Sequence, residues 1–388
     1  MSGRDPFCQP RRIGRGAALT LVFTSVLVAG AATGSFDESV GKATSAAGSD
    51  TLTAEDDTVT EAAAKAMADG KSPMEAAERA VSRSGDRWSA VYSQGEYQEF
   101  EEALDGQYTG VGLSARRERD GRIEVTRVQP GSPAAGAGVR TGDRLRSVDG
   151  KGVDGRPVTE VVALLRGDAD EAPAGTRVRL GLQRGPHRWD QELRRARLST
   201  DSVSVSRLAD RVVVIRIAAF TKGSGDLVRR TVAEAPKGAG IVLDLRGNSG
   251  GLVTEAVTTA SAFLDGGLVA TYDVNGDQRA LHADPGGDTT RPLVALVDGG
   301  TMSAAELLTG ALQDRGRAVV VGTRTFGKGS VQMPSRLPDG SVAELTVGHY
   351  RTPSGRGVDG RGITPDLVTD REVLKRAETV LSGLGDPS

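Results

Sequence analysis

The spacing of apolar residues changes along the chain, and each change marks a different kind of predicted element. From Thr58 to Ser84, and again from Glu96 to Leu104, apolar residues recur at helical spacing, with breaks near Gly70 and Pro73. This pattern predicts short amphipathic helices over residues 58–105. They are too small to form a domain alone, so we expect them to pack on another part of the chain.

A second stretch, residues 106–190, has the pattern of short strands separated by turns. Ile123–Val128 alternates apolar and polar residues, and Arg177–Gln183 is the last predicted strand of the stretch. Between them, Val158–Leu165 has helical spacing, and glycine-rich turns separate the segments. The stretch therefore predicts one small, strand-rich module.

The third stretch, residues 191–388, alternates apolar strands with amphipathic helices. Near-continuous apolar strands of this kind are buried on both faces, as in a parallel sheet covered by helices. We therefore expect an α/β core. Its predicted strands are Val212–Ile217, Gly238–Leu245, Leu293–Val297 and Ala318–Val321, and its predicted helices are Leu227–Ala235, Leu252–Leu264 and Ser303–Asp314.

The N-terminal residues predict export from the cytoplasm. Four arginines precede the apolar, uncharged segment Ala17–Gly34, and this charge asymmetry favours a cytoplasmic N-terminus with the remainder translocated. Residues 1–34 are thus either a signal peptide cleaved near Ala29-Gly30-Ala31 or a retained membrane anchor. Residues 35–57, rich in Ser, Thr, Gly and acids without periodicity, predict a linker. The bulk of the protein should act outside the cytoplasm.

Composition excludes several classes of function. The 388 residues carry a formal net charge of −2 with mixed signs, which gives no field attractive to nucleic acid. The three histidines have no metal-ligand spacing and no triad pattern, so we expect neither a metal site nor a Ser/His/Asp triad. The single cysteine, Cys8, excludes an intramolecular disulfide. No cofactor is expected.

Three motifs in the second stretch point to peptide binding. Gly110-Val111-Gly112-Leu113, Pro130-Gly131-Ser132-Pro133-Ala134 and Gly142-Asp143-Arg144-Leu145 follow one another in an order that resembles a PDZ domain. Such a domain adds an extended peptide to an open sheet edge. The resemblance implies that the backbone amides of Gly110, Val111, Gly112 and Leu113 capture a C-terminal carboxylate.

Two glycine-rich loops in the third stretch resemble functional loops of other enzyme classes. Gly247–Gly251 resembles the nucleophile loop of trypsin-like proteases, which would make Ser249 catalytic, but it joins a predicted strand to a helix. The only upstream histidine, His187, lies near the end of the PDZ-like segment, whereas those enzymes place His and Asp before the serine in a β-barrel. The amides of this loop instead suit an oxyanion hole. Gly322–Gly329 is one residue short of a nucleotide-binding loop, because Gly329 replaces the magnesium-binding Ser or Thr.

Ser303 and Lys328 are the strongest candidates for catalysis. Lys328 follows a buried strand, where burial would lower the pKa of its amine and let it act as a base. Ser303 stands at the start of a predicted helix, where the simplest alternative is an ordinary N-cap. A serine hydroxyl needs an adjacent base to become a nucleophile, and a neutral lysine can supply it without histidine.

The motifs Asp244–Gly251, Gly300–Glu306, Phe326–Gln332 and Gly362–Asp366 occur in an order that closely resembles the carboxyl-terminal processing peptidases, also called tail-specific proteases. The resemblance extends from Tyr92 to Asp366. It implies a crotonase-like α/β core with an inserted PDZ domain and N-terminal helices. It also implies the site residues: nucleophile Ser303, general base Lys328, orienting residue Gln332, oxyanion amides of Ala304 and of Gly250 or Gly251, and supporting acids Glu306 and Asp314.

The sequence therefore predicts an exported serine endopeptidase that binds protein C-termini through its PDZ domain. Some relatives dimerise through their N-terminal helices, which implies a homodimer here. Met302 stands where many relatives have a small residue, and its larger side chain is expected to narrow the pocket beside the nucleophile. Two alternatives are a non-catalytic tail-binding scaffold on the same core and an acyl-CoA enzyme. Intact Ser303, Lys328 and Gln332 disfavour the scaffold, and the PDZ-like insertion disfavours the acyl-CoA enzyme.

Overall fold

The computed structural model describes residues 50–167, 172–208, 211–274 and 277–385. Two compact units divide the chain: Gln107–Ser199, and a larger unit that joins the residues up to Gly106 to those from Thr200 onward. The candidate signal or anchor segment, residues 1–34, lies outside the described residues. Within the described ranges, no helix has both the length and the apolar character to cross a bilayer.

The smaller unit is a strand-rich module built on a sheet of order β3-β4-β5-β7-β8, with β6 paired to β5 and a separate pair β2-β9. Alternating residues of β4 and β7, such as Ile123, Val125, Val178 and Leu180, point into its core. Its elements are β2 (Gln107–Gly110), β3 (Leu113–Arg117), β4 (Ile123–Val128), α4 (Pro133–Gly136), β5 (Arg144–Val148), β6 (Lys151–Gly152), α5 (Val158–Arg166), β7 (Arg177–Arg184), β8 (His187–Arg194) and β9 (Ala196–Ser199).

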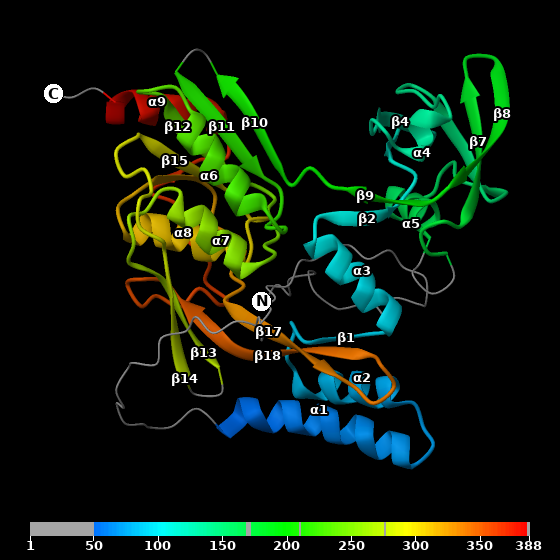
Figure 1. The fold of residues 1–388 in the computed structure, drawn as a ribbon, viewed down its shortest axis with the longest axis horizontal. Helices are drawn as coiled ribbons and strands as arrows, with labels where there is room; N and C mark the ends of the chain where they lie inside the picture. The colour runs from blue at the N-terminus through cyan, green and yellow to red at the C-terminus, as the bar shows by residue number, and fades with distance from the viewer. Residues whose placement is uncertain (1–49, 168–171, 209–210, 275–276, 386–388) are drawn as a thin grey trace, which may run out of the picture. The chain divides into compact units, whose positions relative to one another are not determined.

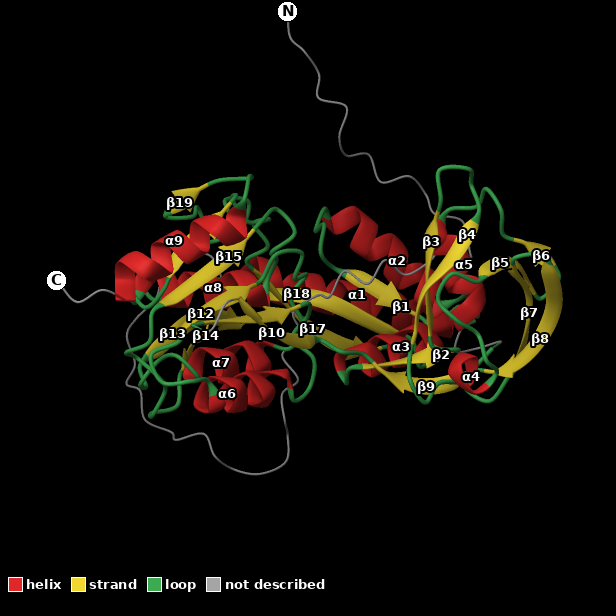
Figure 2. Ribbon diagram, turned by 90° about the horizontal axis from the view of Figure 1, so that it is seen from above, coloured by secondary structure: helices red, strands yellow, loops and turns green. Residues whose placement is uncertain are grey.

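The larger unit contains a sheet of order β10-β11-β12-β15-β16-β19, parallel except for β10 at one edge. Period-two alternation buries both faces, because Ile241 and Leu243 of β12 face one cluster and Val242 faces another. Helices α6 and α7 cover the first face and α9 covers the second (Figure 2). The elements are β10 (Val203–Leu208), β11 (Val212–Ile217), α6 (Ser224–Glu234), β12 (Gly240–Asp244), α7 (Val253–Ser261), β15 (Leu293–Val297), α8 (Ala304–Asp314), β16 (Val319–Gly322), β19 (Leu367–Val368) and α9 (Val373–Gly385).

A second, antiparallel sheet of the larger unit holds β18 at its centre. Strand β17 pairs along one edge of β18, while β1 and the β13-β14 hairpin pair along the other (Figure 1). The remaining elements are α1 (Asp50–Ala68), α2 (Pro73–Ser84), β1 (Ala90–Tyr92), α3 (Gln94–Leu104), β13 (Leu268–Val274), β14 (Asp277–His282), β17 (Ser330–Arg336) and β18 (Val342–Arg351).

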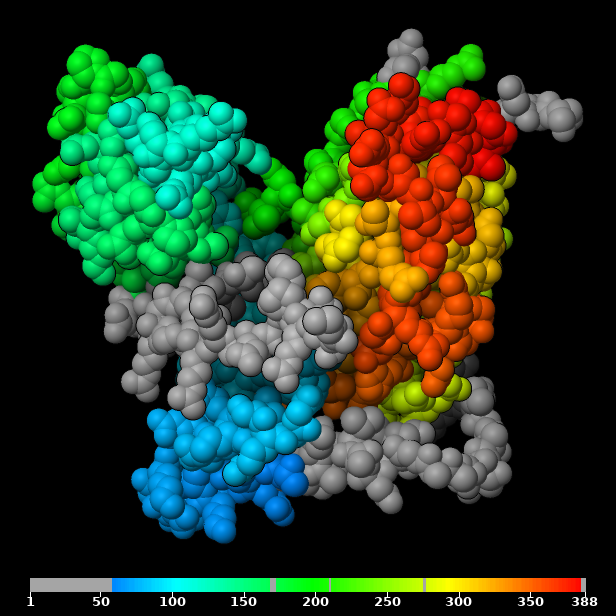
Figure 3. Space-filling view, turned by 180° about the vertical axis from the view of Figure 1, so that it is seen from behind, coloured from blue at the N-terminus to red at the C-terminus, as the bar shows by residue number. Residues whose placement is uncertain are grey.

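The N-terminal helices pack on this second sheet. Val59 and Ala63 of α1 and Val81 of α2 join Ala343 and Leu345 of β18 in one apolar cluster. In the space-filling view, the blue surface of residues 58–84 adjoins the orange surface of β17 and β18 (Figure 3). The expectation that these helices need a partner surface is thus confirmed. Helix α1 begins at Asp50, inside the predicted linker, because Asp50–Asp57 contains neither Gly nor Pro to oppose a helix.

Candidate active site

Three loops meet at the carboxyl edge of the parallel sheet. They follow β12, β15 and β16, which are neighbours in the sheet order. The first loop carries Gly250 and Gly251, the second Ser303, and the third Lys328. Because loops at the same end of adjacent parallel strands lie side by side, residues far apart in the sequence converge here.

Ser303 has a backbone conformation that distinguishes it from the other helix-start serines. Ser72, Ser93 and Ser132 are extended N-caps, with φ between −60° and −79°. Ser303 precedes α8 at φ 59° and ψ −119°, which a non-glycine residue adopts only under strain. It is completely buried. The backbone of this turn therefore departs from the extended N-cap conformation, although Glu306 accepts the Ser303 amide as in a capping box. It resembles the sharp turn that presents the nucleophilic serine of α/β-hydrolases.

Glu306 connects the serine and lysine loops. One carboxylate oxygen accepts the amides of Ser303 at 2.9 Å and Lys328 at 2.8 Å. The other accepts the Thr325 hydroxyl at 2.5 Å and the Gly327 amide at 2.7 Å. Burial raises the pKa of Glu306, and these hydrogen bonds oppose the shift. The side chain therefore fixes the backbone of both candidate catalytic residues.

The glycine loop lies against the serine turn. A Cβ on Gly250 would come within 3.0 Å of the Ser303 Cβ and 3.4 Å of the Ala304 amide nitrogen, so only glycine fits. The Gly250 amide donates to Asn248 Oδ1 at 2.8 Å. Among the described residues, the amides of Gly251 and Ala304 have no acceptor. Of the predicted oxyanion donors, Gly251 and Ala304 are thus available and Gly250 is occupied.

Lys328 is completely buried, and its Nζ has no hydrogen-bond partner among the described residues. Burial lowers the pKa of this amine from 10.5 to about 8, although nearby carboxylates, Glu344 foremost, favour the charged form. A buried ammonium without partners is costly, whereas a neutral amine is less so. The surroundings thus favour the neutral amine that a general base requires.

Gln332 and Tyr350 lie beside the two loops. The Gln332 amide donates to Ser330 Oγ at 2.9 Å and Thr346 Oγ1 at 3.0 Å, while its Oε1 is buried and has no partner in the described part of the chain. Gln332 and Ser303 are therefore not hydrogen-bonded to Lys328 Nζ in this arrangement, and the orienting role of Gln332 stays a prediction. The Tyr350 hydroxyl donates to the carbonyl of Ser303 at 3.0 Å.

Replacing Lys328 with Met should stabilise the protein at pH 7. The folded pKa of about 8 lies below the unfolded value, so the unfolded chain binds the proton more tightly. Stability contributed by this lysine therefore falls as pH drops from about 10.5 to 8, by roughly 3 kcal/mol. Urea unfolding should show Lys328→Met more stable by about 1–3 kcal/mol at pH 7, with most of that gain absent at pH 10.

Lys222, an exposed lysine near Asp105, supplies the control for that comparison. Lys222→Met should change stability by less than about 0.5 kcal/mol at either pH. An equal gain from both substitutions, or a Lys328→Met gain that is independent of pH, would contradict a penalty from the buried amine.

The structure does not bring Asp314 to the site. Asp314 ends α8, about 16 Å along the helix from Ser303. There it accepts the Ser354 amide at 3.0 Å and pairs with Arg356. The sequence placed Asp314 among the acids near the site, and the structure corrects this expectation. The rise of the helix separates Asp314 from Ser303, whereas Glu306 lies on the first turn.

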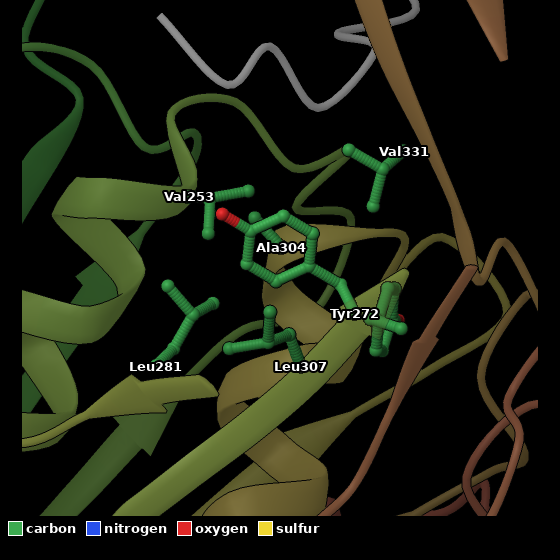
Figure 4. A pocket seen from close by; sticks show the side chains of 7 residues that line it. Val253, Tyr272, Leu281, Ala304, Leu307 and Val331 are labelled. Carbon is green, nitrogen blue, oxygen red and sulfur yellow. The ribbon is translucent and has the colours of Figure 1, made fainter. Parts of the chain in front are cut away.

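An apolar pocket adjoins Ser303. It has about 250 Å³ of free space, solvent at its mouth included. Side chains from helices α7 and α8 and from strands β13, β14, β17 and β18 converge on it. Its lining includes Ala304, the residue after the serine (Figure 4). No charged side chain lines it, so it suits an apolar substrate side chain. Its lining is Val253, Tyr272, Leu281, Ala304, Leu307, Val331 and Tyr350.

Two buried polar residues that sequence analysis assigned no role hold the glycine loop. The side-chain amide of Asn248 donates to the Ile217 carbonyl. The backbone carbonyl of Asn248 accepts the Met302 amide at 2.8 Å, which ties the loop to the serine turn. Asp244 accepts Arg246 through both carboxylate oxygens, which fixes the end of β12. An asparagine inside a glycine-rich loop is a recognisable signal for such a turn.

The candidate PDZ residues lie in the smaller unit. Gly110 ends β2 and Leu113 begins β3, the open edge strand of the sheet. Gly112 has φ 79°, and a Cβ there would lie 2.1 Å from the Ser132 Cβ, so glycine is required by the fold itself. An open edge strand after a glycine loop suits peptide addition.

Comparison with known proteins identifies the family. Residues 211–369 match the model of peptidase family S41, and residues 124–184 match the PDZ domain model. The solved structure of a photosystem II D1 C-terminal processing protease is 30% identical, with TM-score 0.51, and the match covers 81% of this chain and 86% of that one. The chain belongs to peptidase family S41. Its smaller unit holds a PDZ domain.

Two curated relatives resemble this S41 member over most of its sequence. It is 33% identical over 290 residues to the carboxy-terminal processing protease CtpA of Bacillus subtilis (strain 168), a match covering 74% of this chain and 61% of the relative. It is 34% identical over 293 residues to a probable CtpA-like serine protease of Staphylococcus aureus (strain N315), covering 74% of this chain and 57% of the relative. The chain thus spans about three fifths of their length.

Proposed function

We propose that this S41 member is a serine endopeptidase of the carboxy-terminal processing type that uses a Ser303/Lys328 pair on a crotonase-like core. The observation that carries the proposal is the buried amine of Lys328, which has no hydrogen-bond partner within the described ranges. The Lys328 and Ser303 amides also share one Glu306 oxygen. A base near pH 8 and a strained serine in one enclosed site support acyl transfer.

In the proposed reaction, the Lys328 side chain turns so that Nζ takes the proton of the Ser303 hydroxyl. Oγ then attacks the peptide carbonyl carbon, and the Gly251 and Ala304 amides stabilise the oxyanion. The Lys328 ammonium returns its proton to the leaving amine as the peptide bond breaks. Water, deprotonated by the same amine, then hydrolyses the acyl-enzyme. The apolar pocket holds the side chain on the acyl side of the cleaved bond.

The rate should depend on pH through Lys328. Because the base must be neutral, kcat/KM should rise with pH through about 8 and level above it. At pH 6, two units below, the rate should be lower by about a hundredfold. A stopped assay with an unstructured protein substrate, from pH 5.5 to 9.5, measures this profile. A rate that is constant across this range would refute the lysine-base role.

The PDZ domain is proposed to bind the free C-terminal tail of the substrate outside the cytoplasm. Amidation of that tail removes the carboxylate expected at Gly110–Leu113, so kcat/KM should fall by about tenfold or more for the amidated form of one unstructured peptide. Mass spectrometry of the products compares the two forms. Equal cleavage of both would contradict tail recognition, whereas tail binding with no Ser303-dependent cleavage would favour the non-catalytic scaffold.

A further inference from the structure

Trp88 lies in a turn that is anchored on both sides. This turn follows α2 and precedes β1. The backbone amides of Trp88 and Ser89 donate to the Asp86 carboxylate at 2.9 and 3.1 Å. Ser89 Oγ accepts the amide of Thr346 at 3.0 Å, which ties the turn to the middle of β18. The backbone of Trp88 is therefore fixed against the sheet that carries Gln332.

The Trp88 ring faces the amine of Lys328. Lys328 Nζ lies 5.0 Å from the ring centroid, and the ring packs on Phe326, with centroids 5.7 Å apart and an interplanar angle of 63°. Arg87 lies over the same indole, at 4.4 Å from its centroid. Trp88 is half-buried, while Lys328 is fully buried. The indole is thus part of the cover that separates the amine from solvent.

We propose that Trp88 is a positioning residue for catalysis: its indole excludes water from the Lys328 amine and so favours the neutral form of that amine in the absence of substrate. The inference rests on the proposed Ser303/Lys328 function. It assigns the N-terminal region a role in the site, since the turn between α2 and β1 supplies this residue. Trp88 acts through Lys328 and does not itself react.

The groups around Lys328 set the sign of the expected effect. Carboxylates face it from several elements: Glu344 on β18, Asp86 in the Trp88 turn, Glu306 on α8, and Asp359 after β18. All four favour the ammonium, and the face of the indole attracts it too. Burial nevertheless dominates and lowers the pKa to about 8. Opening the cover should therefore admit water and raise this pKa.

The test is the pH dependence of kcat/KM for the full chain and for Trp88→Ala. The acid limb should move up by about one pH unit in Trp88→Ala, so that the rate at pH 7 falls about tenfold while the plateau at high pH changes less. Trp88→Phe, which keeps an aromatic cover, should leave the acid limb close to its wild-type position. Trp88→Leu provides a second truncation that keeps an apolar side chain and should give an intermediate shift.

Trp189 supplies the matched control, because it is also half-buried and has Arg184 over its ring at 5.4 Å. Trp189→Ala should leave the acid limb in place. An acid limb that stays fixed or moves to lower pH in Trp88→Ala, or an equal shift in Trp189→Ala, would overturn the proposal.

A readout without catalysis separates this inference from the proposed function. In protein labelled with ¹³C at lysine Cε, the resonance lost in Lys328→Met identifies Lys328, and its titration gives the pKa directly. The midpoint should lie near 8 and rise in Trp88→Ala. This rise in a protein that cleaves nothing would support the role of Trp88 while the proposed function fails. Normal cleavage by the wild-type protein, with no rise of the Lys328 pKa in Trp88→Ala, would support the proposed function and overturn the role of Trp88.

Discussion

Replacing Ser303 with Ala should reduce kcat/KM by at least about 10⁴-fold, because the proposed nucleophile is lost and water must attack directly. Lys328→Ala should cost nearly as much. The double variant should be no worse than either single one, since two residues that act as a unit are strongly non-additive. Mass spectrometry of products from one unstructured substrate measures all three.

The fold should survive the Ser303 substitution, which makes the loss of activity interpretable. Alanine retains Cβ, so the strained φ of 59° and the tight packing against Gly250 persist, and stability should change by less than about 1 kcal/mol. Ser303→Gly should be equally inactive yet more stable by about 1 kcal/mol, because glycine adopts positive φ without strain. Retention of more than a tenth of wild-type cleavage in Ser303→Ala would reject Ser303 as the nucleophile.

Removing the carboxylate of Glu306 should have the largest effect on stability and should also abolish activity. In Glu306→Ala, the amides of Ser303, Gly327 and Lys328 lose their buried acceptor, as does the Thr325 hydroxyl. Buried donors left unsatisfied are costly, and the expected loss is about 3–5 kcal/mol. Denaturant unfolding measures the loss, and the cleavage assay shows whether the two loops still align.

Glu306→Gln gives a graded version of the same test, because it keeps the volume but turns one acceptor into a donor. Its loss should be smaller than that of Glu306→Ala, and activity should still fall by about a hundredfold or more. Asp314→Asn is the control on the same helix. Asp314 bonds Ser354 and Arg356 at the far end of α8, so this variant should lose some stability while its kcat/KM stays within about threefold of wild type. Equal inactivation by both substitutions would assign the effect of Glu306 to the helix rather than to the site.

The location of the site is consistent with the proposed mechanism, in which a serine and a lysine act together without histidine. Ser303 follows β15 and Lys328 follows β16, which are adjacent parallel strands. One buried carboxylate, Glu306, then sets the spacing of the two backbones. In that mechanism the amine needs no second proton carrier, because burial outweighs the nearby carboxylates and lowers its pKa to about 8.

Local sequence patterns were sufficient for the elements whose residues are buried within continuous apolar runs. Strands β11 and β15 have the bounds expected from their valine- and leucine-rich segments, and α8 begins one residue after Ser303. Strand β14 of the β13-β14 hairpin was not predicted, because polar and charged residues dominate it and it is exposed. Its Leu281 nevertheless lines the pocket, together with Tyr272 of β13, a contribution visible only in the tertiary structure.

The sequence alone determined the family resemblance, the order of the motifs and the candidate residues Ser303 and Lys328, because these depend on residue type and spacing. Tertiary structure decided how those residues meet. It placed Asp314 at the end of α8 far from Ser303. It also paired the Gly250 amide with the Asn248 side chain and brought the Trp88 ring to the amine of Lys328. These contacts join segments that are remote in the chain, and no local pattern encodes them, because they arise only when strands pair and helices pack on their faces.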